Sequence, residues 1–253
     1  MSIVIHRPAA FTALPSAVLF DLDDTLYAYR PAHAAGLHAA RAKAARQFNI
    51  PENRFNDAFD AARLAVKERL GLTASAHSRL LYFQLALEGL GFGSRVLPAL
   101  DLEQTYWRAY LASAQLFDGV VALLDDLRIA GIPAGVVTDL GAQIQFRKIV
   151  YFGLDNHIDF IVTSEEAGAD KPAPAIFHLA AAKLKPRGDR LWMVGEDPAR
   201  DIGGARAAIG AATIQKIHEG VTPGTGDLRA DAEVTHFDAL RRLIADLRAR
   251  RDK

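Results

Sequence analysis

Two kinds of hydrophobic pattern alternate along the chain, and the points of change mark its organisation. Residues 17–20 form a short apolar run of the kind that makes a buried strand, and three carboxylates follow it closely. From residue 28 to 116 the apolar positions recur at helical spacing, with no strand-like run among them. After residue 117 short apolar runs again alternate with amphipathic segments. The pattern therefore predicts an α/β core, formed by 1–27 and 117–253, into which a helical bundle of residues 28–116 is inserted.

The second part of the core predicts a parallel sheet with helices on both faces, because strand-like and helix-like segments follow one another in turn. The expected strands are Ala134–Thr138, Asp159–Thr163, Leu191–Val194 and Ala211–Ile217. The expected helices include Gly141–Phe152, Pro174–Leu184, Pro198 to about Ala208, and Phe237–Arg250. The first strand, Ala17–Phe20, belongs to the same sheet, so the inserted bundle is expected to act as a cap over the strand ends.

Composition narrows the classes of function. Lys plus Arg and Asp plus Glu both total 30, so the formal net charge is zero, which gives no electrostatic case for nucleic acid or an anionic membrane as partner. The absence of cysteine excludes disulfides, thiolate zinc sites and thiol catalysis. The N-terminal residues lack the apolar core of a signal peptide, and no apolar run reaches membrane-spanning length. We expect a cytoplasmic protein, as a monomer or homodimer.

Polar residues collect where four predicted strands end. Because the carboxyl ends of parallel strands lie on one edge of a sheet, these side chains are expected to share one site. The candidates in chain order are Asp21, Asp23 and Thr25; Thr138 and Asp139; Lys171; and Glu196, Asp197 and Asp201.

This set of residues indicates phosphoryl chemistry. Carboxylate oxygens at such density favour Mg²⁺, and a magnesium ion with lysine and hydroxyl groups is complementary to a phosphoryl group. An aspartate beside the metal can attack phosphorus, which gives an aspartyl phosphate that water then hydrolyses. Asp21 and Asp23 project to the same side of an extended segment, so Asp23 is placed to act as acid and then as base.

The same residues carry a resemblance to a known family. The run from Phe20 to Leu26, FDLDDTL, resembles motif I of the haloacid dehalogenase-like hydrolase superfamily. Residues 136–138 resemble its motif II, Lys171-Pro172 its motif III and residues 195–201 its motif IV, and the inserted helices are placed like the C1 cap of subfamily I. The resemblance covers roughly residues 17–220.

It implies a Rossmann-like core, Asp21 as nucleophile, Asp23 as acid and base, and Thr138 and Lys171 on the phosphate. It also implies Mg²⁺ held by Asp21, the Asp23 carbonyl and a carboxylate of motif IV.

Two positions depart from the family pattern. Glu196 stands where the family usually has aspartate, so the metal ligand is either Glu196 or its neighbour Asp197. We favour Glu196, because Pro198 makes Asp197 the natural N-cap of a helix. Asp201 is expected to support the metal or to hold Lys171. Asp139 replaces a common asparagine, and its charge would repel a phosphate unless the side chain turns away or pairs with an arginine.

Substrate contacts are expected from Thr25, Thr138, Asp139 and Lys171, from Tyr27 beside motif I, and from Arg41 in the cap. We interpret the protein as a Mg²⁺-dependent phosphatase of a small phosphorylated metabolite. A phosphomutase of the same family and a non-catalytic phosphate-sensing or scaffold protein remain alternatives. A 2-haloacid dehalogenase is disfavoured because such enzymes lack the second aspartate.

Overall fold

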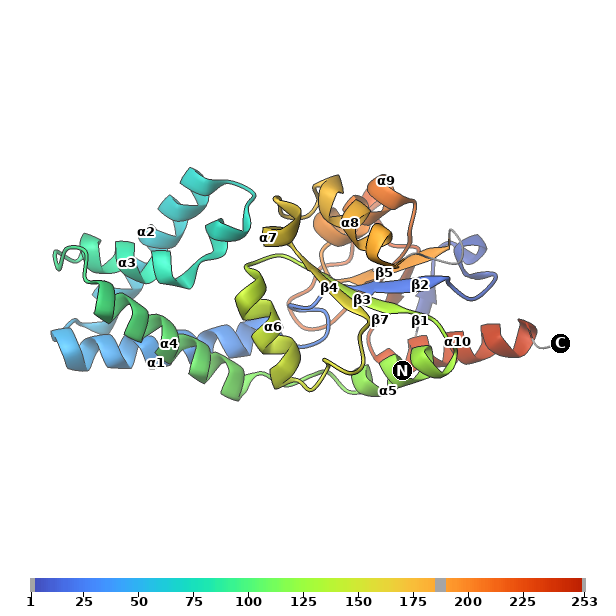
Figure 1. Ribbon diagram of the computed structural model, residues 1–253, viewed down its shortest axis with the longest axis horizontal. Helices are drawn as coiled ribbons and strands as arrows, with labels where there is room; N and C mark the ends of the chain where they lie inside the picture. The colour runs from blue at the N-terminus through green and yellow to red at the C-terminus, as the bar shows by residue number, and fades with distance from the viewer. Residues whose placement is uncertain (1–2, 185–189, 252–253) are drawn as a thin grey trace. The chain divides into compact units, whose positions relative to one another are not determined.

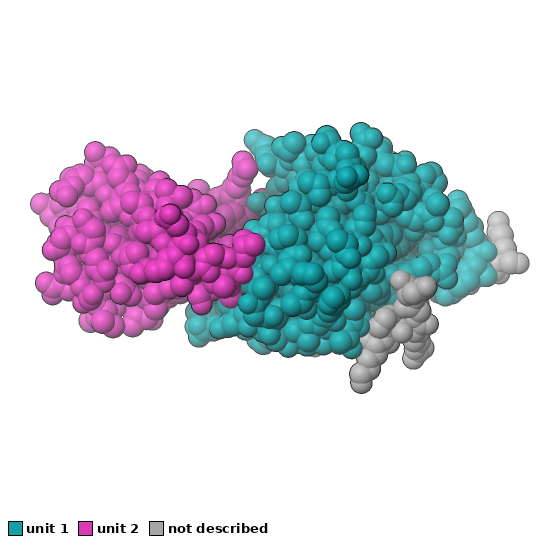
Figure 2. Space-filling model, turned by 90° about the horizontal axis from the view of Figure 1, so that it is seen from above, with its two compact units in different colours: residues 1–27, 116–253 teal, residues 28–115 magenta. Residues whose placement is uncertain are grey.

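The structure is a computed structural model that describes residues 3–184 and 190–251. The chain forms two compact units, one of Met1–Tyr27 with Leu116–Lys253 and the other of Ala28–Gln115 (Figure 2). The division falls within one residue of the boundaries expected from the change in hydrophobic pattern. We refer to these parts as the core unit and the helical unit.

One mostly parallel sheet forms the centre of the core unit (Figure 1). Its strands lie in the order β1-β7-β6-β5-β2-β3-β4, and within it β1 alone of the described strands runs antiparallel, beside β7. This confirms the predicted α/β fold. The strands are β1 (Ile3–Ile5), β2 (Ala17–Phe20), β3 (Ala134–Thr138), β4 (Phe160–Thr163), β5 (Leu191–Gly195), β6 (Ala212–Lys216) and β7 (Ala232–Val234).

The register of the central strands brings their carboxyl ends to one level. Phe20 at the end of β2 lies opposite Val136 of β3 on one side and Val194 of β5 on the other. All three strands are buried along their whole length, which suits a sheet covered on both faces. The polar residues that follow β2, β3 and β5 therefore emerge side by side.

Helices surround the sheet: α5 (Val120–Ile129), α6 (Ala142–Tyr151), α7 (Ser164–Ala167), α8 (Pro174–Leu184), α9 (Gly204–Ile209) and α10 (Phe237–Arg251), with 3₁₀ turns η1 (Pro8–Phe11) and η4 (Gly226–Leu228). The face of α8 that carries Ile176 and Phe177 packs on Leu19, Val137 and Met193 of the three central strands. This packing fixes the strand ends that carry the polar residues.

The helix expected from Pro198 to about Ala208 is not a regular α-helix throughout. It begins as a π-helical segment, η3 (Pro198–Gly203), and becomes α9 at Gly204. In the wider turn the N–H of Ile202 bonds to the carbonyl of Asp197 at 3.2 Å. The Asp201 carboxylate also turns back to accept the Asp197 N–H at 3.0 Å, so the wide turn directs Asp201 toward the strand ends.

Four long helices make up the helical unit, joined by a 3₁₀ turn and short links: α1 (Tyr29–Phe48), α2 (Glu52–Leu70), η2 (Ala74–His77), α3 (Arg79–Gly89) and α4 (Val96–Ser113). Tyr106, Trp107 and Tyr110 are buried in the bundle, as expected for core residues. Among the residues that the structure describes, no helix is both long and apolar enough to cross a bilayer.

Candidate active site

Asp21 is the first residue after β2 and is held there by the backbone and by two side chains. Its N–H donates to the carbonyl of Val194 at 2.9 Å, which continues the β2–β5 pairing by one residue. Lys171 Nζ lies 2.5 Å from Asp21 Oδ1, and Thr25 Oγ1 donates to Asp21 Oδ2 at 2.8 Å. The side chain is buried, so one oxygen faces an ammonium and the other a hydroxyl in a low-dielectric setting.

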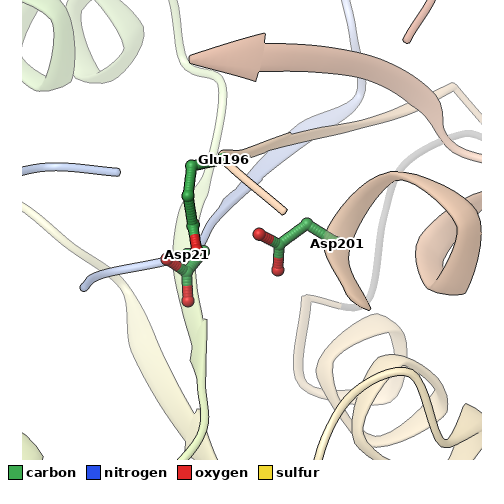
Figure 3. Close-up of side chains that lie close together, drawn as sticks. All are labelled: Asp21, Glu196 and Asp201. Atoms are coloured by element: carbon green, nitrogen blue, oxygen red, sulfur yellow. The ribbon is translucent and has the colours of Figure 1, made fainter. Parts of the chain in front are cut away.

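Three carboxylates converge at this point. Asp21, Glu196 and Asp201 can each place an oxygen within 4.8 Å of the others, and Figure 3 shows Asp201 pointing from its helix toward the other two. Gly195 makes room for this approach, because a Cβ at that position would lie 2.4 Å from the Asp201 side chain. Hard oxygen ligands in a cluster of this size fit a magnesium ion.

Lys171 neutralises part of this charge. Its ammonium bridges Asp21 and Asp201, at 2.5 Å and 2.6 Å. Burial works against the charged form of Lys171, but the carboxylates of Asp201 and Asp21 outweigh it and raise its pKa well above the ordinary value. The lysine is therefore positively charged throughout the working range of pH, as a partner for anionic oxygens must be.

The carboxylates themselves are destabilised as anions. Burial raises the pKa of Asp21 despite the opposing charge of Lys171, and Asp201 adds to the increase. Burial also raises the pKa of Glu196 well above its ordinary value, and the charges of Asp21 and Asp201 act in the same direction. A divalent cation would remove this penalty, because it stabilises the ionised form of each ligand.

We expect the metal-free protein to lose stability as pH rises. Because folding raises the pKa of Glu196 and Asp21, the folded state holds protons that the unfolded state has already released above about pH 4. The contribution of these protons to the stability of the folded protein is complete below the ordinary carboxyl pKa. It is lost as the pH rises through the pKa values that the two groups have in the folded protein. In EDTA, Tm should fall from pH 5 to pH 8 more in the wild type than in Glu196→Gln. An equal fall of Tm with pH in the wild type and in Glu196→Gln would contradict this expectation.

Glu196 and Asp197 have different roles in the structure. A Glu196 carboxylate oxygen lies 2.8 Å from Thr25 Oγ1 and joins the cluster, whereas Asp197 Oδ1 accepts the N–H groups of Ala199 and Arg200 at 2.8 Å and 2.9 Å. Asp197 is thus the N-cap of the helix, and the alternative of Asp197 as metal ligand is not supported. The extra methylene of glutamate allows Glu196 to reach Asp21 from beyond the end of β5.

This difference gives a paired test of the metal site. Glu196→Gln should raise the Mg²⁺ concentration needed for half-maximal activity or binding by at least about 10-fold, since it removes a charged ligand. Asp197→Asn should leave the Mg²⁺ requirement nearly unchanged, because asparagine caps a helix as well as aspartate does. Magnesium titration calorimetry of both variants measures the effect, and a larger loss in Asp197→Asn would reverse the assignment.

Asp23 is held by Lys148, which the sequence did not place in the site, and by Tyr27, which it placed beside the substrate. Lys148 Nζ, on α6, lies 2.7 Å from both Asp23 carboxylate oxygens, and the Tyr27 hydroxyl also donates to Asp23. Lys148 is fully buried. Tyr27 is buried too, and packs on Phe152, so it does not line the mouth of a pocket as expected but supports Asp23 from behind.

Thr138 is oriented by the same helix. Gln145 Nε2, one turn before Lys148, lies 2.6 Å from Thr138 Oγ1 and donates to the Asp139 carbonyl at 2.6 Å. No local pattern marks Gln145 and Lys148 as site residues, because polar residues on an amphipathic helix are normally exposed and their burial is a property of the packed structure.

Asp139 turns away from the strand ends, which was one of the outcomes expected for it. Its carboxylate pairs with Arg200 Nη2 at 2.5 Å and accepts the N–H of Lys171 at 2.8 Å. Burial raises the pKa of Asp139, and the charges of Lys171 and Arg200 oppose the increase. Asp139 is thus a link between motifs, and the expectation that it contacts substrate is withdrawn.

Two other expected substrate contacts are engaged elsewhere. The Thr25 hydroxyl is fully buried between the Asp21 and Glu196 carboxylates, 2.8 Å from an oxygen of each, a position that orients these two side chains. Arg41 lies within the helical unit, where Nε is 3.3 Å from a Glu52 carboxylate oxygen and Nη2 contacts His38. Its contact with substrate stays a prediction.

Comparison with known proteins agrees with this geometry. The family model for haloacid dehalogenase-like hydrolases matches residues 15–208. A ribulose-1,5-bisphosphate 5-phosphatase of Halopiger xanaduensis is 39% identical over 79% of this chain and 84% of its own length. A glyceraldehyde 3-phosphate phosphatase of Methanopyrus kandleri is 30% identical over 91% of this chain and 99% of its own length.

A comparison with solved structures finds the same fold. The crystal structure of a 2-haloacid dehalogenase from Pseudomonas syringae pv. Tomato superposes with a TM-score of 0.73, at 24% identity, over 92% of this chain and 99% of that one. At this identity the likeness shows the fold alone. With the four polar strand ends, the family match over most of the core and the relatives of similar length, the chain belongs to the haloacid dehalogenase-like hydrolases.

Proposed function

We propose that the protein is a Mg²⁺-dependent phosphatase that hydrolyses a small phosphomonoester through an aspartyl phosphate on Asp21. The observation that carries the proposal is the buried cluster in which Lys171 bridges Asp21 and Asp201 while Glu196 lies against Thr25. Asp21, Glu196 and Asp201 would hold the metal. Magnesium bound there would offset the charge of the carboxylates and of the phosphoryl oxygens.

In the first step a carboxylate oxygen of Asp21 attacks phosphorus, and the bond to the ester oxygen breaks. Asp23 donates a proton to the departing oxygen, so the alcohol leaves neutral. Lys171 neutralises charge on the phosphoryl oxygens, and Thr138, oriented by Gln145, supplies a hydroxyl contact. In the second step Asp23 removes a proton from water, the water attacks the aspartyl phosphate, and inorganic phosphate and the Asp21 carboxylate are released.

The named relatives favour phosphorylated sugars as the first substrates to test. The relative from Halopiger is named for a sugar bisphosphate and that from Methanopyrus for a triose phosphate. The second aspartate, Asp23, favours phosphoryl transfer over dehalogenation, because displacement of a halide needs no proton donor.

A panel of phosphomonoesters with Mg²⁺ tests the proposal. Ribulose 1,5-bisphosphate and glyceraldehyde 3-phosphate are included with nucleotides and phosphorylated amino acids, and both free phosphate and isomerised product are measured. We expect phosphate release from at least one sugar phosphate, abolished by EDTA. Product in which phosphate has moved to another hydroxyl would indicate a phosphomutase, and no turnover of any member would indicate a non-catalytic protein.

A further inference from the structure

One cavity of the core unit shares no lining residue with the carboxylate cluster. It has a volume of about 320 Å³, within the range of small-molecule sites. Its walls are residues 117–118, where the chain enters the core unit from the helical unit, residues 216–218 at the end of β6, and residues 235–237 between β7 and α10. Figure 1 shows α10 running beside α5.

The ammonium of Lys216 lies in the wall of this cavity. Its Nζ donates to the carbonyls of Ile217 at 3.2 Å and Thr235 at 3.1 Å. It also lies 4.2 Å from the ring centroid of Phe117 and 5.7 Å from that of Phe237. All four of these residues line the cavity, so the charged end of a buried side chain is surrounded by the cavity's own residues.

Lys216 differs from the two other lysines that are buried among the described residues of the core unit. Lys148 and Lys171 are paired with carboxylates, whereas no ion pair with a carboxylate joins Lys216 in the part of the chain that the structure describes. Burial lowers the pKa of Lys216 to about 8. Carbonyl oxygens and aromatic faces stabilise an ammonium only partly, so the site would gain from an anion.

The remaining lining strengthens the case for an anion. His236 adds a ring nitrogen that can donate a hydrogen bond, and α10, a helix of 15 residues, begins at Phe237 with the positive end of its dipole at the wall. Asp118 contributes a carboxylate to the lining, which disfavours a highly charged ligand. The rings of Phe117 and Phe237 offer apolar surface that a compact hydrated ion would not use.

We propose that this cavity binds a small organic monocarboxylate, with its carboxylate on Lys216 and its apolar body against Phe117 and Phe237. Such a ligand would touch two residues that hold the turn after Asp23. The N–H of Phe117 donates to the Leu26 carbonyl at 2.9 Å, and His218 Nε2 donates to the Asp24 carbonyl at 2.8 Å. The site is independent of the proposed hydrolysis and can be tested without it.

Benzoate, an aromatic monocarboxylate, is the probe, and calorimetric titration of the full chain is the measurement. Asp21→Asn protein serves as the background, so that the catalytic cluster cannot turn over a ligand. We expect benzoate to bind with one-to-one stoichiometry, and its neutral isostere benzamide to bind at least about 10-fold more weakly. Lys216→Met should weaken benzoate at least about 10-fold, while Lys216→Arg should stay within about threefold of the parent, because arginine keeps the charge.

Lys183→Met is the matched control, since Lys183 pairs with Glu166 elsewhere on the core unit and should leave benzoate binding unchanged. Benzamide as tight as benzoate, an unchanged affinity in Lys216→Met, or no benzoate binding at all would overturn the proposal. Displacement of benzoate by equimolar inorganic phosphate would also overturn it, because the apolar body would then contribute nothing. If Lys216→Met does not fold, the proposal is still tested by the affinity of benzamide relative to benzoate and by the affinity of benzoate for Lys216→Arg.

Discussion

Asp21→Asn should abolish phosphomonoester hydrolysis, with a loss of at least about 10⁴-fold in kcat, because the amide cannot attack phosphorus and no other carboxylate takes its place. The substitution is nearly isosteric and keeps one carbonyl oxygen, which can accept from Lys171 in place of the Asp21 carboxylate oxygen. Phosphate release under saturating substrate measures the effect, and circular dichroism of the variant establishes that it is folded.

The trapped intermediate gives an independent measurement on the same residue. Beryllium with fluoride should form a tetrahedral mimic of the phosphoryl group on the Asp21 carboxylate in the wild type but not in Asp21→Asn. ¹⁹F NMR detects the bound fluoride. Full activity in Asp21→Asn, or an unchanged fluoride signal, would exclude Asp21 as the nucleophile.

Asp23→Asn should lower kcat by roughly 10²- to 10⁴-fold, the usual contribution of general acid–base catalysis. The loss should depend on the leaving group. An aryl phosphate such as p-nitrophenyl phosphate departs without much need of a proton, so its hydrolysis should suffer much less than that of a sugar phosphate. The kcat/KM values for the two substrates provide the comparison, because they report the step in which the leaving group departs, whereas hydrolysis of the aspartyl phosphate is common to both.

Asp24→Asn is the matched control. Asp24 adopts a left-handed backbone with φ of 61°, a conformation that asparagine tolerates at least as well, and we assign it no step of the reaction. Its kcat should remain within a few-fold of the wild type for both substrates. An equal loss for aryl and sugar phosphates in Asp23→Asn would mean that Asp23 supports the site structurally and does not transfer the proton.

Much of the core unit could be predicted from local pattern. The strands Ala17–Phe20 and Ala134–Thr138 and the helix Pro174–Leu184 have the bounds expected from the sequence, because each is a continuous apolar or amphipathic run with clear ends. The strands Ile3–Ile5 and Ala232–Val234 were not expected. Each has three residues and depends on tertiary pairing, β1 with β7 across more than two hundred residues and β7 also with β6, which no local pattern records.

Some residues of the candidate site could likewise be predicted from local pattern, whereas others depend on tertiary packing. Asp21, Lys171 and Glu196 were predicted because each follows a predicted strand or precedes a predicted helix. Lys148 was not predicted, since a lysine on a helix is normally exposed, and only the packing of α6 reveals that it is buried against Asp23. Tyr27 was expected near the surface and is buried, because the burial of a side chain depends on residues that are distant in the sequence.

The sequence by itself determined the class of fold, the inserted position of the helical unit and the four segments that meet at one sheet edge. It could do so because periodicity and turn chemistry act over a few residues. The choice between neighbours was decided by tertiary structure. Asp197 caps a helix while Glu196 reaches Asp21, Asp139 turns to Arg200, and Lys148 holds Asp23. Each choice depends on which oxygen or ammonium lies within about 3 Å, a distance that only the packed chain fixes.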